Sequence, residues 1–549
     1  MASPGSHARA PLLWLLLPFM AGLVAGKLWP QLPVSPRALA LTGALLSLAA
    51  TALAWWRPRA PRWPWATLLV SGVALAGLAL IQTQSPALPD GTAVPREINV
   101  TLEVTQVFSA APKSKTLAGL GRIVSVDEHV PGLAGQLVYF SAIRKVSVPP
   151  LRSGRYAVRG LLQPLPPDSD AADFNDYLAN LGIRQRLMRA QIIREVRPPG
   201  ALPRFYAAAA ERLEKILTHG LDRHPEIVSV YLGMMLGEKA VLSTEQQNAF
   251  MRSGTFHIFS VSGLHVAAIA LALLGLLRLA RVPERIAVVV GLPVLWLYVQ
   301  ITGGSMPAVR AFLMIAFLLG TRVFRLPGNS LAALAGAALL TLLLDPRQLF
   351  STGFQMSYAV VTALVLMGAP LADKWLDAWR PFASLPKVSW QRWQRWTEEG
   401  GRKFLAAFAA SWVAFLASTP SGIGYFELFS PGSLVANLLV IPLSSFALAA
   451  GFVSLLTGLC GLLPLSLLFN RAAAMLILGM DWLVLHGTAL PGAYFPAHFR
   501  AGWLAPAGLA TLIALMLCGR HVRWAPERGG FWLPVAFVVL LLIFGVKFG

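Results

Sequence analysis

Apolar stretches close to the length of a membrane-spanning helix recur along most of the chain, separated by short polar loops. A helix needs about 20 apolar residues to cross the hydrocarbon core of a bilayer. The candidate spans are residues 11–26, 38–56, 65–81, 256–279, 286–302, 305–321, 330–345, 352–369, 404–420, 432–458, 465–490, 502–519 and 531–547. The pattern predicts a polytopic α-helical membrane protein with about 11–13 spans, because several stretches are short or interrupted by Gly and Pro.

Between the third and fourth stretches the pattern changes to one typical of β-strands. Apolar residues at 98, 100, 102 and 104 alternate with polar residues at 99, 101, 103 and 105, which is the period of a half-buried strand. Further strands are expected at 117–126, 135–142, 154–163 and 183–196, with a short helix from Asp173 to Leu181. Five strands with a helix before the last predict an inserted Greek-key barrel of the OB type.

These patterns divide the chain into five segments. We expect N-terminal membrane helices at 1–91, the OB-like domain at 92–200, linker helices at 201–255, a large membrane domain at 256–500 and C-terminal membrane helices at 501–549. Residues 203–219 form an amphipathic helix that suits either the membrane surface or a position against other helices.

Composition agrees with a membrane protein and adds a strong positive charge. Charged residues make up 13% of the chain, against about 25% in soluble domains, and the mean hydropathy is +0.61, which excludes an ordinary soluble enzyme. The net charge is +21. More than half of this surplus falls in five loops, after the second, fourth, sixth, eighth and twelfth stretches, all on one side of the membrane in this arrangement. That side is predicted to be cytoplasmic, which leaves the barrel outside.

A smaller basic surplus belongs to the barrel and suggests nucleic acid. Residues 96–197 contain 14 Lys or Arg and 9 Asp or Glu. OB-folds hold single strands by stacking bases on aromatic rings beside a basic groove. The candidate DNA-binding residues are Arg155, Tyr156, Arg159, Arg184, Arg186 and Arg189, and Phe108, Tyr139 and Phe140 are further candidate aromatic residues. Alternatively, the aromatic residues form the barrel core and the barrel packs on the bilayer.

Polar residues inside the later apolar stretches are the strongest functional markers. Such groups cost free energy in a bilayer unless they face a partner or an aqueous cavity. The candidates are His257, Ser260, Ser262, Gly263, His265, Arg310, Gln355, Ser357 and Asn437. Breaks at Gly and Pro accompany several of them, as in the discontinuous helices of transport proteins. We expect these residues to line a polar passage, although helix–helix hydrogen bonds would explain each of them individually.

Ser262 and His265 also invite a catalytic interpretation. They are three residues apart and can therefore touch on a helix. However, the G-x-S-x-G motif is absent, and no acidic residue lies near in sequence to orient the imidazole. His257 and His265 alone are too few ligands for a metal. We expect no catalytic residue, no metal site and no cofactor, with a membrane-bound hydrolase as the alternative.

The same residues resemble a known family. His257 to Val266 resembles the H-x-x-x-[IV]-S-G-L-H signature of ComEC-type competence proteins, which are inner-membrane channels for DNA uptake in bacterial transformation. Similar elements of that family occur in order at Asp173–Ile183, Leu236–Lys239, Pro307–Ala311, Asp345–Pro346, Gly353–Ser357 and Ala436–Pro442. Together they cover about residues 90–500 of the chain.

The resemblance implies an OB-like external domain and a competence domain that passes one DNA strand across the bacterial inner membrane. Many family members also have a metallo-β-lactamase-like domain proposed to degrade the other strand, which requires a His-x-His-x-Asp-His motif. This sequence has nine His and no His-x-His, and its last apolar stretch runs to the final residues. We therefore expect a form without that domain, which depends on a separate nuclease.

The expected partners follow from what this sequence does not contain. No Gly-Lys-Ser/Thr Walker motif is present, so a cytoplasmic ATPase or helicase, or the proton gradient, would supply the energy. We also expect single-stranded DNA, membrane lipid and an extracytoplasmic DNA receptor as partners. The loop at 370–403, with five Trp among its charges, is a candidate docking surface for the ATPase or an interfacial anchor. A secondary transporter of a small anion or lipid precursor is the rival function; internal repeats would favour it, and none is evident.

Overall fold

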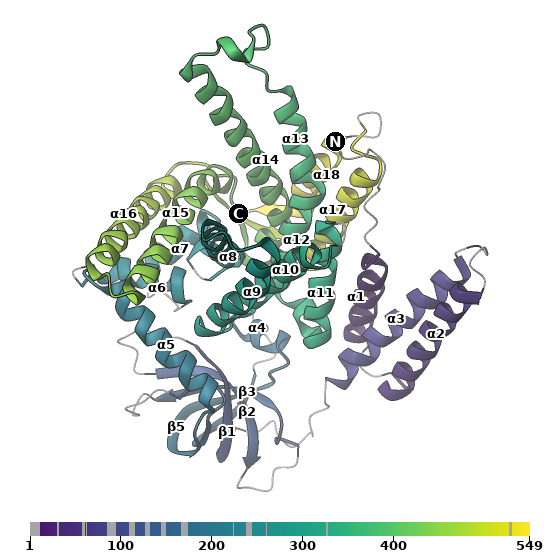
Figure 1. Ribbon diagram of the computed structural model, residues 1–549. Helices are drawn as coiled ribbons and strands as arrows, with labels where there is room; N and C mark the ends of the chain where they lie inside the picture. Colours follow the sequence, from purple (N-terminus) through teal and green to yellow (C-terminus); the bar gives the residue numbers. More distant parts are fainter. Residues whose placement is uncertain are drawn as a thin grey trace. The chain divides into compact units, whose positions relative to one another are not determined.

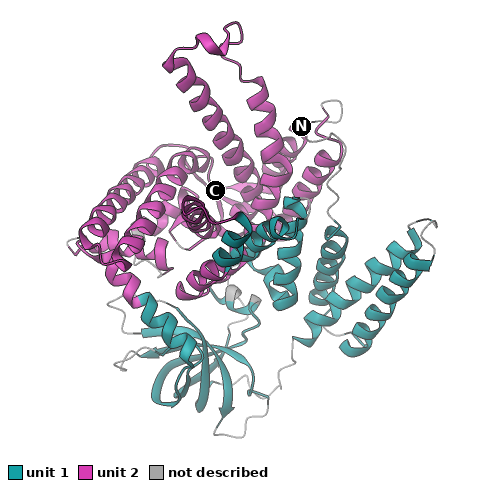
Figure 2. Cartoon of the chain, in the orientation of Figure 1, with its two compact units in different colours: residues 1–210, 284–292, 312–354 teal, residues 211–283, 293–311, 355–549 magenta. Residues whose placement is uncertain are grey.

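The computed structural model is mostly helical and contains one small β-barrel (Figure 1). It describes residues 11–29, 32–56, 61, 63–84, 95–108, 116–126, 132–143, 150–165, 174–222, 224–237, 244–259, 261–325, 328–525 and 530–549. The chain forms two compact units, coloured separately in Figure 2: residues 1–210, 284–292 and 312–354, and residues 211–283, 293–311 and 355–549.

Nine helical segments in the described residues are long and apolar enough to cross a membrane. They are α2 (Pro36–Trp56), α3 (Trp63–Thr83), α9 (Glu284–Ile301), α10 (Met306–Val323), the continuous segment Thr352–Ala378, α14 (Arg392–Phe426), α15 (Ser433–Leu459), α16 (Leu463–Thr488) and α17 (Leu504–His521). Shorter apolar helices are α1 (Leu13–Leu28), α6 (Pro225–Leu236), α8 (Gly263–Leu279), α11 (Ser330–Leu344) and the segment Trp532–Gly545. The chain is a multi-pass helical membrane protein, as the hydropathy pattern predicted.

The N-terminal helices of the first unit pack closely through small residues. An added Cβ at Gly43 of α2 would lie 2.7 Å from the carbonyl oxygen of Gly72 in α3, so the two backbones touch. Gly22 of α1 makes the same kind of approach to Ala74 of α3. Small residues allow such close contact between helices in a bilayer, where dispersion replaces the hydrophobic effect as the driving force.

The barrel of the first unit is closed and has five strands. They are β1 (Arg96–Phe108), β2 (Thr116–Val126), β3 (Leu137–Ile143), β4 (Arg155–Pro164) and β5 (Gln185–Arg197), in the order β1-β2-β3-β5-β4. All neighbours are antiparallel except β3 and β5. The alternating residues Ile98, Val100, Leu102 and Val104 of β1 are buried in the barrel core. The predicted small barrel and its five strands are confirmed.

Two short elements join this barrel to helices of the same unit. The helix α4 (Phe174–Asn180) precedes β5, and the predicted Asp173 lies outside the described residues. After α11, the 3₁₀ turn η3 (Pro346–Phe350) follows Asp345, whose carboxylate accepts the Arg347 backbone N–H. The Arg347 guanidinium donates to the Leu181 carbonyl at 3.0 Å, just beyond α4. An element near residue 182 thus contacts one near residue 347.

The second unit is built around the helix pair α15 and α16. The helices α6 and α7 (Thr244–Arg252) pack on α16, and α5 (Ala201–Thr218) ends nearby. A buried polar node connects these helices. Asn470 of α16 donates to the Ile216 and His219 carbonyls, and its Oδ1 accepts from Tyr231 and Ser454. Asn470 is fully buried, so these bonds satisfy its amide and fix the helices against one another.

Several helix boundaries differ from the hydropathy stretches. The predicted span 256–279 is split: a 3₁₀ turn η2 (Phe256–Ile258) comes first, and α8 begins only at Gly263. The polar interruption at 370–403 is largely a helical hairpin. Here α12 (Thr352–Ala363), a π turn η4 (Leu364–Gly368) and α13 (Ala369–Ala378) continue to residue 378, and α14 starts at Arg392 after the short turn η5 (Lys387–Ser389). Charged residues outside the bilayer remain helical because Arg, Lys, Glu and Gln are good helix formers.

The last span also ends differently. The helix α18 (Trp532–Leu540) passes into the π turn η7 (Leu541–Gly545) and then a short strand β8 (Val546–Phe548). This strand pairs with β7 (Phe495–Phe499), which pairs with β6 (Leu428–Phe429). The small sheet covers a local apolar cluster that includes Ile423, Ala497 and Val546.

Candidate functional site

The polar segment at the start of α8 is organised by a helix cap. Ser262 is the N-cap residue in an extended conformation, and His265 occupies the third helical position. The Ser262 backbone N–H donates to Nδ1 of His265 at 3.2 Å, and the Ser262 Oγ lies 2.8 Å from the same nitrogen. This is a capping box with His in the place usually taken by Glu or Gln. The contact predicted from the three-residue spacing is present.

The two bonds determine the state of the imidazole ring. A backbone N–H can only donate, so Nδ1 must carry a lone pair and accept. The Ser262 hydroxyl therefore also donates to Nδ1, and the proton of the neutral ring sits on Nε2. His265 is fully buried, and within the described residues its Nε2 makes no hydrogen bond of standard geometry. Among the described residues, no carboxylate is bonded to this ring as in a hydrolase triad.

A buried arginine lies at the next helix. Arg310 of α10 is 3% exposed, and its guanidinium interacts electrostatically with Tyr358 of α12. An added Cβ at Gly263 would lie 3.7 Å from the Cβ of Ala311, so the capped start of α8 meets α10 beside Arg310. A cation this deeply buried requires polar surroundings, which makes its position the most unusual one among the candidates.

The polar contacts continue to α14. Gln355 lies one turn before Tyr358 on α12, and its Oε1 accepts from the Tyr425 hydroxyl at 2.7 Å. Tyr425 is near the end of α14. The Arg310–Tyr358 interaction and the Gln355–Tyr425 hydrogen bond therefore link α12 to α10 and to α14. Ser357 is half-buried on the same helix α12.

Asn437 and Ser433 extend the polar residues onto α15, which packs on α8. Ser433 is 7% exposed, and its Cβ would lie 2.9 Å from a Cβ added at Gly254. The Oδ1 of Asn437 is buried and accepts no hydrogen bond within the described residues. A buried amide oxygen in this state is a ready acceptor for a bound group or water.

His257 and Ser260 complete the candidates at this segment. His257 lies in η2 with an exposed side chain, near enough to His265 for the two rings to interact electrostatically. Ser260 lies outside the described residues. No group of three or more His, Cys, Asp or Glu able to hold a metal occurs in the described ranges.

Tyr358 and Tyr425 are the functional candidates that sequence reasoning missed. Tyr358 directly follows the Gly353–Ser357 element and interacts electrostatically with Arg310, so the local motif offered a signal. Tyr425 is 70 residues from Gln355 and lies outside every motif. Only the fold brings it to the site.

The six predicted DNA-binding residues of the barrel fall into three groups. Tyr156 is 8% exposed, packs in the barrel core and accepts the Leu151 N–H with its hydroxyl, so it has no open ring face for a base. Arg155 and Arg159 pair with Glu103 and Glu97 across β1, at 2.8 and 2.9 Å. The Arg159 guanidinium lowers the pKa of the Glu97 carboxyl through a hydrogen bond and its charge. Arg184, Arg186 and Arg189 stand on β5 or just before it, with Arg184 and Arg189 exposed.

An aromatic cluster lies beside Arg186. Phe108 and Tyr139 have ring centroids 6.4 Å apart, and the Phe174 ring lies 6.1 and 5.3 Å from them. Arg186 pairs with Tyr139 between β5 and β3 and donates to the Asn175 side chain. Burial raises the pKa of the Tyr139 hydroxyl, and the nearby Arg186 charge lowers it by a smaller amount. Arg186 is half-buried, and Phe108 and Tyr139 also pack against a small apolar cluster. Aromatic rings beside arginines are the combination that holds unpaired bases.

Comparison with known proteins agrees with this geometry. The family model described as "Competence protein" matches residues 234–523, which is more than half of the chain and includes α8, α10, α12, α14 and α15. The chain belongs to the competence protein family. No solved structure matches it.

Individual competence proteins and one uncharacterised protein are similar over part of their length. ComE operon protein 3 of Bacillus subtilis is 26% identical over 230 residues, which cover 42% of this chain and 26% of that protein. Recombination protein 2 of Haemophilus influenzae is 25% identical over 250 residues, covering 44% and 29%. The uncharacterised protein YcaI of Escherichia coli is 29% identical over 266 residues, covering 46% and 32%. The matches therefore span about a quarter to a third of these relatives.

Proposed function

We propose that this competence protein conducts one strand of DNA across the cytoplasmic membrane of a bacterium during natural transformation. The observation that carries the proposal is the buried Arg310, which interacts with Tyr358 and lies on α10 beside the capped start of α8. These residues all lie in the region matched by the competence family. A cation and several hydroxyl and amide groups are unfavourable next to lipid. Inside apolar helices they are suited to contact with a polyanion that passes through the protein.

The chemistry of the site matches phosphodiester transit. The Arg310 guanidinium attracts one phosphate at a time, and the Tyr and Gln groups exchange hydrogen bonds with sugar and phosphate oxygens. Conduction requires binding favourable enough for entry and weak enough for release. A single buried cation among neutral polar groups meets that requirement better than a cluster of arginines, which would retain the strand.

The barrel receives the strand in this proposal. Its closed five-stranded barrel with the order β1-β2-β3-β5-β4 supports an OB-like domain. Bases stack on Phe108, Tyr139 and Phe174, while Arg184 and Arg186 contact phosphates. The distribution of basic loops supports an extracytoplasmic position for this domain.

Other components complete the process. An external receptor delivers DNA, a separate nuclease removes the second strand, and a cytoplasmic ATPase or helicase, or the proton gradient, drives import. The protein itself acts as a passage and not as an enzyme. The Ser262–His265 pair supports this division, because its geometry is that of a helix cap.

A genetic experiment tests the proposal. Deletion of the gene abolishes entry of labelled DNA into the cytoplasm, while DNA still binds to the outside of the cell, and wild-type protein restores entry. Unchanged entry in the deletion strain would contradict the proposal. Reconstituted protein that moves a small anion or a lipid precursor, with normal DNA entry in the deletion strain, would identify the rival transporter.

A further inference from the structure

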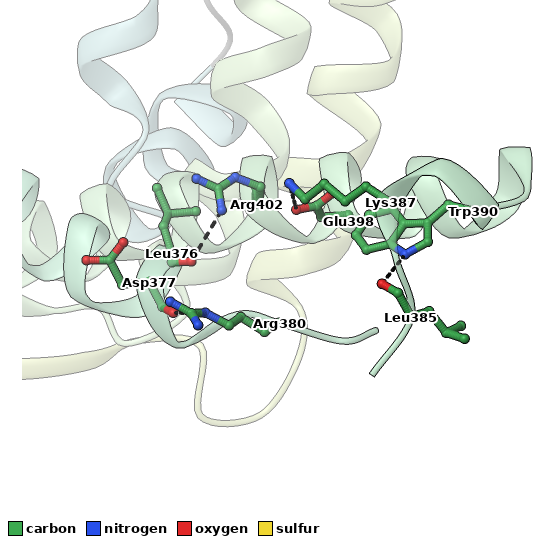
Figure 3. A network of polar contacts seen from close by, with 8 residues as sticks. All are labelled: Leu376, Asp377, Arg380, Leu385, Lys387, Trp390, Glu398 and Arg402. Carbon is green, nitrogen blue, oxygen red and sulfur yellow. Dashed lines mark hydrogen bonds and ion pairs between the residues drawn. The ribbon is translucent and has the colours of Figure 1, made fainter. Parts of the chain in front are cut away.

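The hairpin of α13 and α14 ends in an ordered tip that no proposed step of import uses. Figure 3 shows its polar contacts. Arg402 donates to the Leu376 carbonyl, Trp390 donates to the Leu385 carbonyl at 3.1 Å, and Lys387 pairs with Glu398 at 3.7 Å. These bonds connect the two helices with the turn between them, so the tip is held in one shape.

Two tryptophans on this tip are held in place yet open to solvent. The Trp393 indole donates to Gln391 at 2.7 Å and packs edge-on against Phe382 at 5.5 Å, but 54% of it remains exposed. Trp396 follows one turn later and is 73% exposed. Each tryptophan is directly preceded by an exposed arginine, Arg392 or Arg395. We call these four residues the tip stripe.

Helix length separates the tip stripe from the lipid interface. The 23 residues from Phe404 to Phe426 contain no charged side chain and are enough to cross the hydrocarbon core. Trp396 precedes Phe404 by eight residues, or about 12 Å, and Trp393 by eleven, or about 16 Å, along the helix. The headgroup layer adds only about 5–7 Å on each side. The stripe therefore projects beyond the aromatic belt in which interfacial tryptophans normally lie.

The composition of the stripe fits single-stranded nucleic acid. Residues three apart on a helix are neighbours, with Cβ atoms about 5–6 Å apart, so the two indoles present adjacent stacking surfaces. Exposed aromatic rings alternating with arginines are the elements with which proteins hold unpaired bases and their phosphates. Residues 371–403 carry seven basic and four acidic side chains, and Glu398 is paired with Lys387. The hairpin therefore has a net positive charge, which is complementary to a polyanion.

The position of the stripe along α14 gives this surface a role. Tyr425, which contacts Gln355 of the candidate path, lies at the other end of the same helix. The 29 residues between Trp396 and Tyr425 correspond to about 44 Å, well beyond the hydrocarbon core of about 30 Å. One helix thus carries polar path residues at one face of the membrane and the stripe at the opposite face.

We propose that the tip stripe is a second DNA-binding site, which receives the single strand as it leaves the membrane on the cytoplasmic side. This inference rests on the proposed function, and it adds a binding site on the face opposite the barrel. Bases stack on Trp393 and Trp396, while Arg392 and Arg395 contact the flanking phosphates.

Site-directed cross-linking on the full-length protein in nanodiscs tests binding. Gly400 is exposed, lies one turn beyond Trp396 and has open space around it. A Gly400→Cys variant in a Cys460→Ser, Cys518→Ser background carries a maleimide photo-cross-linker, since both native cysteines are exposed. Labelled oligo(dT) is the probe. Val388→Cys is the matched control, because Val388 is 94% exposed on the same tip but lies off the stripe.

The expected result is cross-linking from position 400 well above that from position 388, decreasing with salt. It falls at least about tenfold in Trp393→Ala, Trp396→Ala and is retained in Trp393→Phe, Trp396→Phe, because a phenyl ring still stacks. Equal cross-linking from 388 and 400, or no loss in the alanine variant, would overturn the proposal. So would exclusive cross-linking to lipid, which would make the tip an interfacial anchor.

Uptake into cells separates this site from the proposed function and from a protein partner. The proposal expects the Trp393→Ala, Trp396→Ala variant to lower cytoplasmic DNA entry, and the Leu385→Ser, Val388→Ser variant to leave it normal. Loss of entry only in the latter pair would assign the tip to a protein partner and overturn the DNA site. If the gene-deletion strain shows normal DNA entry while cross-linking at position 400 is specific, the proposed function is contradicted. The DNA-binding site at the tip would then still be supported.

Discussion

At the scale of single residues, the Ser262–His265 pair explains how a helix can begin beside apolar neighbours. The first backbone N–H groups of a helix have no partner within it, and leaving them unpaired away from water is costly. Nδ1 of His265 accepts the backbone N–H of Ser262, the N-cap residue. The Ser262 hydroxyl bonds to the same nitrogen. In the proposed function this pair acts through hydrogen bonding and helix geometry.

This role predicts which substitutions are tolerated. His265→Gln keeps an acceptor at the third helical position, as in the common capping box, so we expect near-normal stability and DNA entry. His265→Ala and Ser262→Ala should each lower stability by about 1–2 kcal/mol and reduce entry. Thermal unfolding in detergent, measured beside uptake, checks both effects. If His265→Gln is as defective as His265→Ala, the imidazole itself is required and the capping account is wrong.

Residue patterns predicted the touching pair and the buried cation but not every orientation. The three-residue spacing of Ser262 and His265 indicated contact, and hydropathy marked Arg310 as unusual. Tyr156 shares its strand face with the buried Val158, so alternation along β4 places it inside the barrel. Tyr425 had no local signal, because its partner Gln355 is supplied by another helix.

At the scale of elements, hydropathy located the helices but not their ends. The apolar part of α14 begins near Phe404, yet the helix begins at Arg392, where Gln391 and Gln394 form a cap. Conversely, the apolar run after residue 256 is not one continuous helix. It contains a turn, because Ser262 is extended and is the N-cap residue at which α8 begins. Caps and propensities determine helix ends, whereas hydropathy reports only burial in lipid.

The contact of Arg347 with the chain after α4 gives a prediction about the barrel's attachment. Gly182 has a φ of +77°, and an added Cβ would collide with the Arg347 guanidinium. We therefore expect Gly182→Ala to lower stability by about 1–2 kcal/mol through backbone strain, with a further loss from the collision. Arg347→Ala removes the hydrogen bond to Leu181 and should destabilise by about 1–3 kcal/mol.

A double-mutant cycle distinguishes this contact from general damage. In the double variant the collision is absent, so the combined loss should be smaller than the sum of the single losses. Thermal unfolding and protease cleavage between barrel and helices, both on full-length protein, provide the measurements. Strict additivity would show that Gly182 and Arg347 act independently.

At the scale of the whole molecule, the net charge of +21 is divided between topology and recognition. Most of it lies in loops predicted to face the cytoplasm. On β5 a few arginines pair with no carboxylate among the described residues, and Arg310 is buried among the membrane helices. The sequence predicted this division in outline. It did not show that Arg155 and Arg159 are neutralised by Glu103 and Glu97, which lie more than 50 residues earlier.

The division predicts different salt dependence for different arginines. In full-length protein carrying the Trp393→Ala, Trp396→Ala background, Arg184→Gln with Arg186→Gln should weaken oligo(dT) binding and reduce the logarithmic salt slope by about 1.4, since each single-strand phosphate contact contributes about 0.7. The matched pair Arg155→Gln with Arg159→Gln should change the slope less, because carboxylates already neutralise those charges. Fluorescence anisotropy over a salt series gives the slopes, and equal changes for the two pairs would reject the assignment.

The central claim is that the buried cation of α10 serves the passage of DNA. Its most direct test is entry of labelled DNA into the cytoplasm of strains expressing Arg310→Ala, with Arg310→Lys and Arg322→Ala as controls. Arg322 lies on the same helix in an exposed ion pair with Glu284. With membrane levels equal, we predict at least a tenfold loss of entry for Arg310→Ala, partial entry for Arg310→Lys and normal entry for Arg322→Ala. Normal entry with Arg310→Ala at wild-type protein levels would contradict the account.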